Sequence, residues 1–331
     1  KQKTAYEIGV RLVGSEMCIR DSTSQRVVGA RRGGLFRAHG DDLSMKRPID
    51  LLTISYLNHK AFKECKRLWL YRYAPEHVVS GEALWEVIRQ GRLLPATALL
   101  GRVVDDVITA ALRFRKRNGR WPTKPTAAIQ KVWDDYFTFS QNWTSAVGSG
   151  GRWPRRSGKQ AIDRLYFGEE FEADEIQTLI TQGEDFIVRW FKLALLSELD
   201  ELDLAAWRVP ASGVTPHFML GDLKVYAKFD FMTVEPDRVR IYDWKTGNLQ
   251  RGEQSARIQL HGYAAYASQT LSVPLEQIEL ISVWLGANFE GVEKVDKELL
   301  SSLERSHWLS LWLQLQTPIQ RDNQYHRKAQ A

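Results

Sequence analysis

Two aspartates and a lysine are the side chains of this sequence best suited to chemistry. If the chain turns midway between them, Asp230 and Asp243 lie directly opposite each other on neighbouring strands. Opposed carboxylates destabilise a sheet by up to about 1 kcal/mol unless a cation lies between them, and a divalent metal ion is the candidate. Lys245 points to the same face as Asp243, and its ammonium suits an attacking water or a developing phosphate charge. The alternative is a solvated hairpin in which Lys228 or Lys245 neutralises the acids.

A hairpin is the element that would position these groups. Apolar and polar residues alternate over 223–232, and the alternation resumes at Val239 after the turn segment Glu235-Pro236-Asp237-Arg238. This pattern predicts two paired strands. The acid and the lysine of the second strand then share one face, while Tyr242 and Trp244 point to the opposite face.

A predicted helix follows the hairpin, because residues 255–267 lack strand alternation and place Gln259 and Tyr263 at i and i+4 on one helical face. With this helix, the region resembles the PD-(D/E)XK nuclease superfamily, in its RecB-type exonuclease branch. The residues that carry the resemblance are Asp230, Asp243-Trp244-Lys245-Thr246-Gly247 and Gln259-Leu260-His261-Gly262-Tyr263.

The resemblance implies a role for each matching side chain. Asp230 and Asp243 would bind Mg²⁺ or Mn²⁺, and Lys245 would assist the attacking water. Gln259 and Tyr263 would lie along the active site and the DNA. It also implies an α/β fold with a restriction-endonuclease-like core, in which helices and a helical insertion flank a mixed central sheet.

A third metal ligand is expected on a helix over 97–114, where an apolar stripe repeats at helical spacing. The family carries Gly-x-x-x-His on such a helix, and the match here is Gly101 followed four residues later by Asp105. A hard cation such as Mg²⁺ accepts a carboxylate oxygen in place of histidine. The alternatives are a solvated Asp105, or Asp106 as the ligand if the helix is rotated.

Composition indicates a globular protein, because the 331 residues are 44% hydrophobic and 26% charged and contain no apolar run long enough to span a membrane. The formal net charge of +6 is compatible with a polyanionic partner. Cys18 and Cys65 are the only cysteines, which excludes a disulfide framework and favours a cytoplasmic location. The chain is similar to CRISPR adaptation exonucleases, but it lacks the cysteines of their iron–sulfur cluster.

The chain is expected to form one nuclease domain over 45–331, with a helical insertion at about 120–200. Residues 1–22 resemble translated adaptor sequence, and we expect 1–44 to be a non-native or disordered leader. A basic arm that binds nucleic acid is the alternative interpretation of this leader.

Several further elements follow from periodicity. A helix over 55–73 is expected to begin at a Ser55 cap, with Lys66 and Arg67 as candidate phosphate contacts. Basic segments with tryptophan, at 115–122 and 148–158, suit single-stranded nucleic acid or are solvated loops. The remaining predicted elements are helices over 127–146, 160–200 and 299–315 and a core strand over 278–285.

The predicted function is metal-dependent hydrolysis of DNA phosphodiesters by an exonuclease of DNA repair, recombination, phage or CRISPR-type processing. The expected partners are DNA, single-stranded or with free ends, and a helicase or another DNA-processing enzyme. One alternative is a catalytically silent DNA-binding or scaffolding member of the fold. Another is a carboxylate-pair sugar hydrolase, which needs neither lysine nor metal.

Overall fold

The computed structural model of the chain describes residues 53–73, 75, 79, 81–148, 160–211, 214–221 and 223–316. The expected leader, most of the basic segment at 148–158 and the tail after Pro318 lie outside the described residues. No helix of the described part is long and apolar enough to cross a bilayer.

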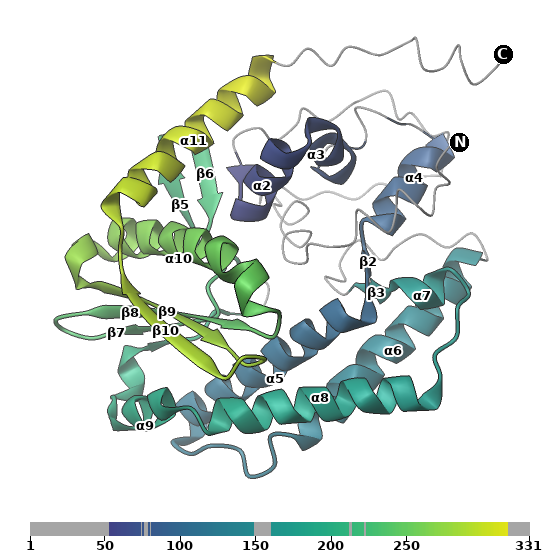
Figure 1. The fold of residues 1–331 in the computed structure, drawn as a ribbon, viewed down its shortest axis with the longest axis horizontal. Helices are drawn as coiled ribbons and strands as arrows, with labels where there is room; N and C mark the ends of the chain where they lie inside the picture. The colour runs from purple at the N-terminus through teal and green to yellow at the C-terminus, as the bar shows by residue number, and fades with distance from the viewer. Residues whose placement is uncertain are drawn as a thin grey trace, which may run out of the picture.

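A five-stranded mixed sheet forms the centre of the fold, in the order β10-β9-β8-β7-β4 (Figure 1). Its strands are β4 (Trp207–Arg208), β7 (Phe231–Val234), β8 (Val239–Lys245), β9 (Ile278–Trp284) and β10 (Phe289–Lys294). The central strand β8 pairs in parallel with β9, and the other neighbours are antiparallel. This arrangement confirms the predicted α/β fold with a mixed sheet, and β9 confirms the strand expected over 278–285.

Helices cover both faces of this sheet (Figure 1). On one face, Ile241 of β8 packs with Leu260 of α10 (Leu249–Leu271). On the other face, Tyr242 and Trp244 share a core with α5 (Ala96–Asn118) and α8 (Ala173–Phe191). Because both faces are covered, six of the seven residues of β8 are buried. The strand that carries the predicted acid and lysine is therefore held rigidly inside the molecule.

The predicted register of the hairpin is confirmed, but the predicted extent of its first strand is wrong. Phe231 pairs with Tyr242 and Val234 pairs with Val239, as a turn centred on Pro236 and Asp237 requires. The segment expected as one strand over 223–232 instead forms β7 and a separate strand.

The separate strand, β6 (Leu223–Tyr226), lies in a second sheet of order β1-β6-β5, with β1 (Thr53–Ile54) and β5 (His217–Leu220). The backbone leaves this sheet at Ala227, whose N–H donates to Pro216 O at 2.8 Å, and the Phe229 N–H then donates to Ala227 O at 3.1 Å. Asp230 is the last residue of this bend, one residue before β7 begins.

The helix predicted over 97–114 is confirmed as α5, and its expected apolar stripe is buried. The helix continues to Asn118 and ends at Gly119, which adopts a left-handed conformation with φ 67° that glycine tolerates without strain. The predicted helix over 127–146 is present as α6 (Ala127–Gly148).

The region 160–200 is divided into α7 (Asp163–Tyr166), α8 and α9 (Ala194–Glu201). Residues ahead of α7 form β3 (Ala161–Ile162), which pairs in parallel with β2 (Leu93–Leu94).

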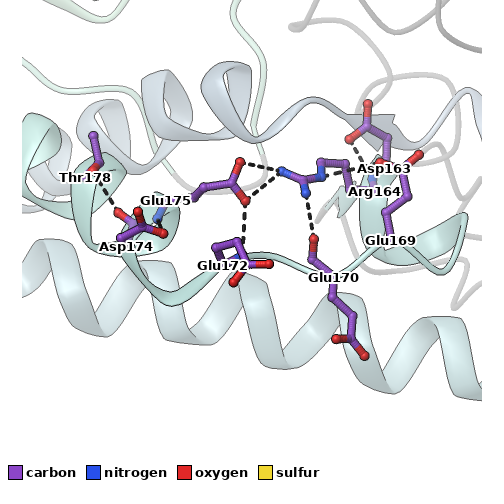
Figure 2. Close-up of polar contacts among 8 residues, drawn as sticks. All are labelled: Asp163, Arg164, Glu169, Glu170, Glu172, Asp174, Glu175 and Thr178. Carbon is purple, nitrogen blue, oxygen red and sulfur yellow. Dashed lines mark hydrogen bonds and ion pairs between the residues drawn. The ribbon is translucent and has the colours of Figure 1, made fainter.

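An arginine fixes the turn between α7 and α8 (Figure 2). The Arg164 guanidinium donates to both carboxylate oxygens of Glu175 at 3.1 Å and to Glu170 O at 2.6 Å. Glu175 in turn accepts the backbone N–H of Glu172, which completes a capping box at the start of α8. These contacts orient α8, the helix that packs against the tryptophan-bearing face of β8.

The helix predicted over 55–73 is split by extended backbone at Cys65 into α2 (Tyr56–Glu64) and α3 (Lys66–Tyr73). The Ser55 cap is confirmed, because its hydroxyl accepts the Asn58 N–H at 3.3 Å. The remaining helices are α4 (Gly81–Gln90) and α11 (Lys297–Gln316), and α11 confirms the helix expected over 299–315.

Candidate active site

Asp243 is the most deeply buried acid of the predicted site. It lies on β8 with 0% of its surface exposed. Its Oδ2 lies 2.7 Å from Lys245 Nζ in an ion pair, and its Oδ1 is buried without a hydrogen-bond partner among the described residues. A buried carboxylate oxygen that lacks a donor is costly, so this oxygen is available to a cation.

Lys245 connects this acid to α10. Its ammonium also donates to Gln259 Oε1 at 3.0 Å, and Gln259 Nε2 donates to Tyr263 OH at 2.5 Å. The predicted i and i+4 pair of α10 therefore lies beside the hairpin, and the four side chains form one polar chain. Because its ammonium contacts both Asp243 and Gln259, the position of the positive charge is fixed.

Asp230 lies beside β8, on the segment that leads into β7, the first strand of the hairpin. The Trp244 N–H donates to its Oδ2 at 2.8 Å, and 7% of the residue is exposed. The confirmed register places Asp230 opposite Asp243, one residue before β7 begins. The two acids therefore stand on neighbouring segments as the sequence predicted.

The two adjacent acids of α5 have different surroundings. Asp105 lines a pocket of about 90 Å³ together with Asp230, Lys228 and Thr246. Asp106 instead accepts a hydrogen bond from Tyr136 OH of α6 at 2.9 Å. Asp105 is the helix acid that faces the candidate site.

Close packing between α5 and the end of β8 brings Asp105 near the sheet. A Cβ added to Gly101 would lie 2.8 Å from Thr246 Oγ1, closer than real Cβ contacts come. The glycine of the Gly-x-x-x-Asp segment is thus explained by a close approach of the helix to the strand end.

Burial dominates the electrostatics of the acids. It raises the pKa of Asp230 well above its usual value, and the negative charges of Asp105 and Asp243 raise it further. Burial also raises the pKa of Asp105, and the positive charge of Lys228 opposes this effect. Burial raises the pKa of Asp243 as well, against the effect of the Lys245 ammonium.

Lys245 keeps its charge in this environment. Burial acts to lower its pKa, but the carboxylates of Asp243 and Asp230 outweigh burial, and the pKa is raised. The site therefore combines three acids that favour an added cation with one protonated lysine.

The chemistry of these donors fits a hard divalent cation. Carboxylate oxygens are the ligands that Mg²⁺ and Mn²⁺ prefer, and Asp243 Oδ1 has no other partner in the described part. Within the described ranges, however, no three His, Cys, Asp or Glu side chains are already gathered as a metal-ligand set. Asp230 shares its pocket with Asp105, whereas Asp243 is held by Lys245.

The structure changes the interpretation of the first basic segment, whereas the candidate phosphate contact of Arg67 stays a prediction. Trp121 of the first basic segment lies edge-on to Trp190, and its Nε1 donates to Asp200 at 2.9 Å, so the partly buried ring packs against the core and is not presented for base stacking. Arg115 belongs to α5 and pairs with the same aspartate at 3.1 Å. Arg67 is exposed on α3, with its guanidinium 5.7 Å from the ring of Tyr71.

The sequence interpretation named Lys228 only as a lysine that could neutralise the acids of a solvated hairpin, and Thr246 only as part of the motif around Asp243. Both side chains line the pocket beside Asp105 and Asp230. Lys228 stands two residues before Asp230, and this spacing could have placed it near the acid.

Comparison with known proteins agrees with this geometry. Among the curated proteins, none matches the chain. The family model of the PD-(D/E)XK nuclease superfamily matches residues 53–328, a span that includes α5, the hairpin and α10. The chain therefore belongs to the PD-(D/E)XK nuclease superfamily.

Proposed function

We propose that this protein is a Mg²⁺- or Mn²⁺-dependent deoxyribonuclease. The observation that carries the proposal is the polar chain from Asp243 through Lys245 and Gln259 to Tyr263, which lies beside Asp230. A surface that only binds phosphate has no need for opposed buried acids, since they repel an anion.

In the proposed mechanism Asp230, Asp243 and Asp105 would hold the cation. When bound, a divalent cation polarises the phosphate and lowers the pKa of water. Lys245 orients the attacking water, because its protonated ammonium is fixed between Asp243 and Gln259. Gln259 is a positioning residue that acts through the lysine, and Tyr263 supports its amide.

We further propose a RecB-type exonuclease that acts on single-stranded DNA or on free ends. The spacing of Gln259 and Tyr263, together with their hydrogen bond, supports this branch. Processing of DNA in repair, recombination, phage or CRISPR-type pathways, with a helicase as partner and a cytoplasmic location, belongs to the same proposal. No four-cysteine cluster is part of it, because the chain has only two cysteines.

The direct test incubates the purified full chain with linear duplex, single-stranded and closed circular DNA. We expect cleavage with Mg²⁺ or Mn²⁺ and none in EDTA, and an exonuclease should spare the closed circle. The matched control is Asp243→Asn, which should lose cleavage by orders of magnitude. DNA cleavage that persists in EDTA would favour a metal-free nuclease, and DNA binding without cleavage would favour a silent member of the fold.

A further inference from the structure

A second lysine lies in the candidate active site. Lys228 belongs to the bend at Ala227–Asp230 between β6 and β7, and its side chain lines the pocket that Asp105 and Asp230 also line. The Ala227 N–H donates to Pro216 O at 2.8 Å, and this bond fixes the backbone just before the lysine. The bend that interrupts the predicted long strand is thus the feature that places a cation in the pocket.

The two lysines of the site differ in their partners. Lys245 is bound to Asp243 at 2.7 Å and to Gln259 at 3.0 Å. Lys228 makes no hydrogen bond or close ion pair with any residue in the described part of the chain. Its charge still acts on its surroundings, because it opposes the burial that raises the pKa of Asp105 and of Asp243. An ammonium that is near acids but bound to none of them retains its donors for another group.

We propose that Lys228 is a substrate-binding residue whose ammonium contacts a phosphate group of the DNA strand at the mouth of this pocket. The inference rests on the proposed nuclease function and adds a contact to it. The pocket of about 90 Å³ has room for several water molecules, since a water needs only about 10 to 15 Å³ of such space. A phosphate that approaches two carboxylates is repelled by them. A free cation on the same wall offsets that repulsion.

The competing explanation is that Lys228 only neutralises Asp105 in the absence of substrate. The two explanations differ in how DNA affinity depends on salt. A lysine that contacts phosphate releases counterions when DNA binds, so its removal lowers the slope of log Kd against log salt. A lysine that only neutralises a neighbouring acid does not change this slope, and its removal strengthens cation binding.

The test measures binding of single-stranded DNA by the full chain in Ca²⁺ over a range of salt concentrations. Lys228→Ala should bind more weakly and reduce the slope by about 0.7, the value of one phosphate contact on a single strand. Lys228→Arg should restore the slope. The matched control is Lys224→Ala on β6, a lysine 5.1 Å from the Tyr226 ring, which should keep the wild-type slope. Lys228→Gln keeps a long side chain without charge and replaces the alanine variant if that variant does not fold.

The outcomes separate the two levels of the proposal. A wild-type slope in Lys228→Ala or Lys228→Gln, in an enzyme that binds and cleaves DNA, would overturn the role of Lys228 alone. A wild-type protein that neither binds nor cleaves DNA would overturn the proposed nuclease function, and the Lys228 contact with it. A reduced slope that arginine restores supports the contact.

Discussion

Single charges decide how the site behaves without a metal ion. Asp230 is 7% exposed and Asp243 is 0% exposed, so water solvates neither carboxylate well. Lys245 pairs with Asp243, whereas within the described part of the chain Asp230 accepts a hydrogen bond only from the backbone N–H of Trp244. A bound cation should therefore stabilise the ionised form of Asp230 more than that of Asp243. Removal of the charge of Asp230 tests this expectation.

We expect Asp230→Asn to raise the melting temperature of the metal-free protein. The amide keeps an oxygen that accepts the Trp244 N–H, but it carries no charge that burial and the other acids oppose. Removal of a buried charge whose ionised form the surroundings disfavour should therefore stabilise the folded, metal-free protein. The same variant should lose the rise in melting temperature that Ca²⁺ gives the wild type. Asp237→Asn, in the exposed turn of the hairpin, should change neither quantity, and a drop in the metal-free melting temperature of Asp230→Asn would contradict the expectation.

Lys245→Ala should separate metal binding from cleavage. Loss of the ammonium frees Asp243 Oδ2, so calorimetry should show Mg²⁺ affinity equal to or above that of the wild type. Single-turnover cleavage should nevertheless fall by about a hundredfold or more, the usual effect of one positioned electrostatic group. Lys294→Ala removes an exposed lysine that pairs with Glu279 on the edge of the sheet, and it should leave both measurements unchanged. Cleavage at the wild-type rate in Lys245→Ala would show that this lysine has no catalytic role.

Among the elements, the hairpin shows what the sequence could predict and what it could not. The register was predictable because a short turn with Pro236 and Asp237 leaves little freedom in pairing. The break before Asp230 was not. Residues 223–231 alternate throughout, yet Leu223 is buried in one cluster, Phe229 in a second and Phe231 in a third. Burial against successive clusters produces the same alternation as burial on one face of a straight strand.

At α5, helical periodicity could not predict which of two adjacent acids faces the candidate site. The apolar stripe predicted which face is buried, but Asp105 and Asp106 are neighbours, about 100° apart around the axis. Only the packing partners decide between them, because Asp106 bonds to Tyr136 of α6 while Asp105 faces Lys228 and Asp230.

Contact between α5 and the end of β8 gives a prediction for Gly101→Ala. The new Cβ would lie 2.8 Å from Thr246 Oγ1, so the helix must shift or the threonine must rotate, and Asp105 moves with the helix. We expect slower cleavage at saturating Mg²⁺. Thr246→Ala removes the oxygen that clashes, so the double variant should recover most of the loss, a coupling expected only for residues in contact. Gly262→Ala on α10 is the control, because its Cβ would meet nothing within 4 Å.

In that control, alanine should raise the melting temperature without slower cleavage, since glycine costs a helix up to about 1 kcal/mol relative to alanine. Equal loss of activity in Gly101→Ala and in the double variant would show that the contact with Thr246 does not position Asp105.

For the whole molecule, the candidate site depends on segments that are far apart in the sequence. Asp105 comes from α5, and Lys228 and Asp230 come from the bend before β7. Asp243 and Lys245 come from β8, and Gln259 comes from α10. α10 also packs on both sheets, because Leu260 joins the core with β8 and Ala265 joins the core with β6. The β1 strand closes one edge of the second sheet by pairing with β6. The stability of this second sheet is therefore linked to the helix that holds Lys245 in place.

Truncation of the N-terminus should test this link. Deletion of residues 1–44 removes no element that the structure describes, and its sequence shows no periodic apolar face, so the melting temperature and the cleavage rate should stay at their full-chain values. Deletion of residues 1–55 also removes β1 and the Ser55 cap of α2. Loss of the cap alone costs about 1 kcal/mol, and loss of the edge strand adds to it, so this variant should melt at a lower temperature. Thermal unfolding and single-turnover cleavage of both truncations provide the measurement, and a large fall in melting temperature on removal of 1–44 alone would show that this leader belongs to the folded domain.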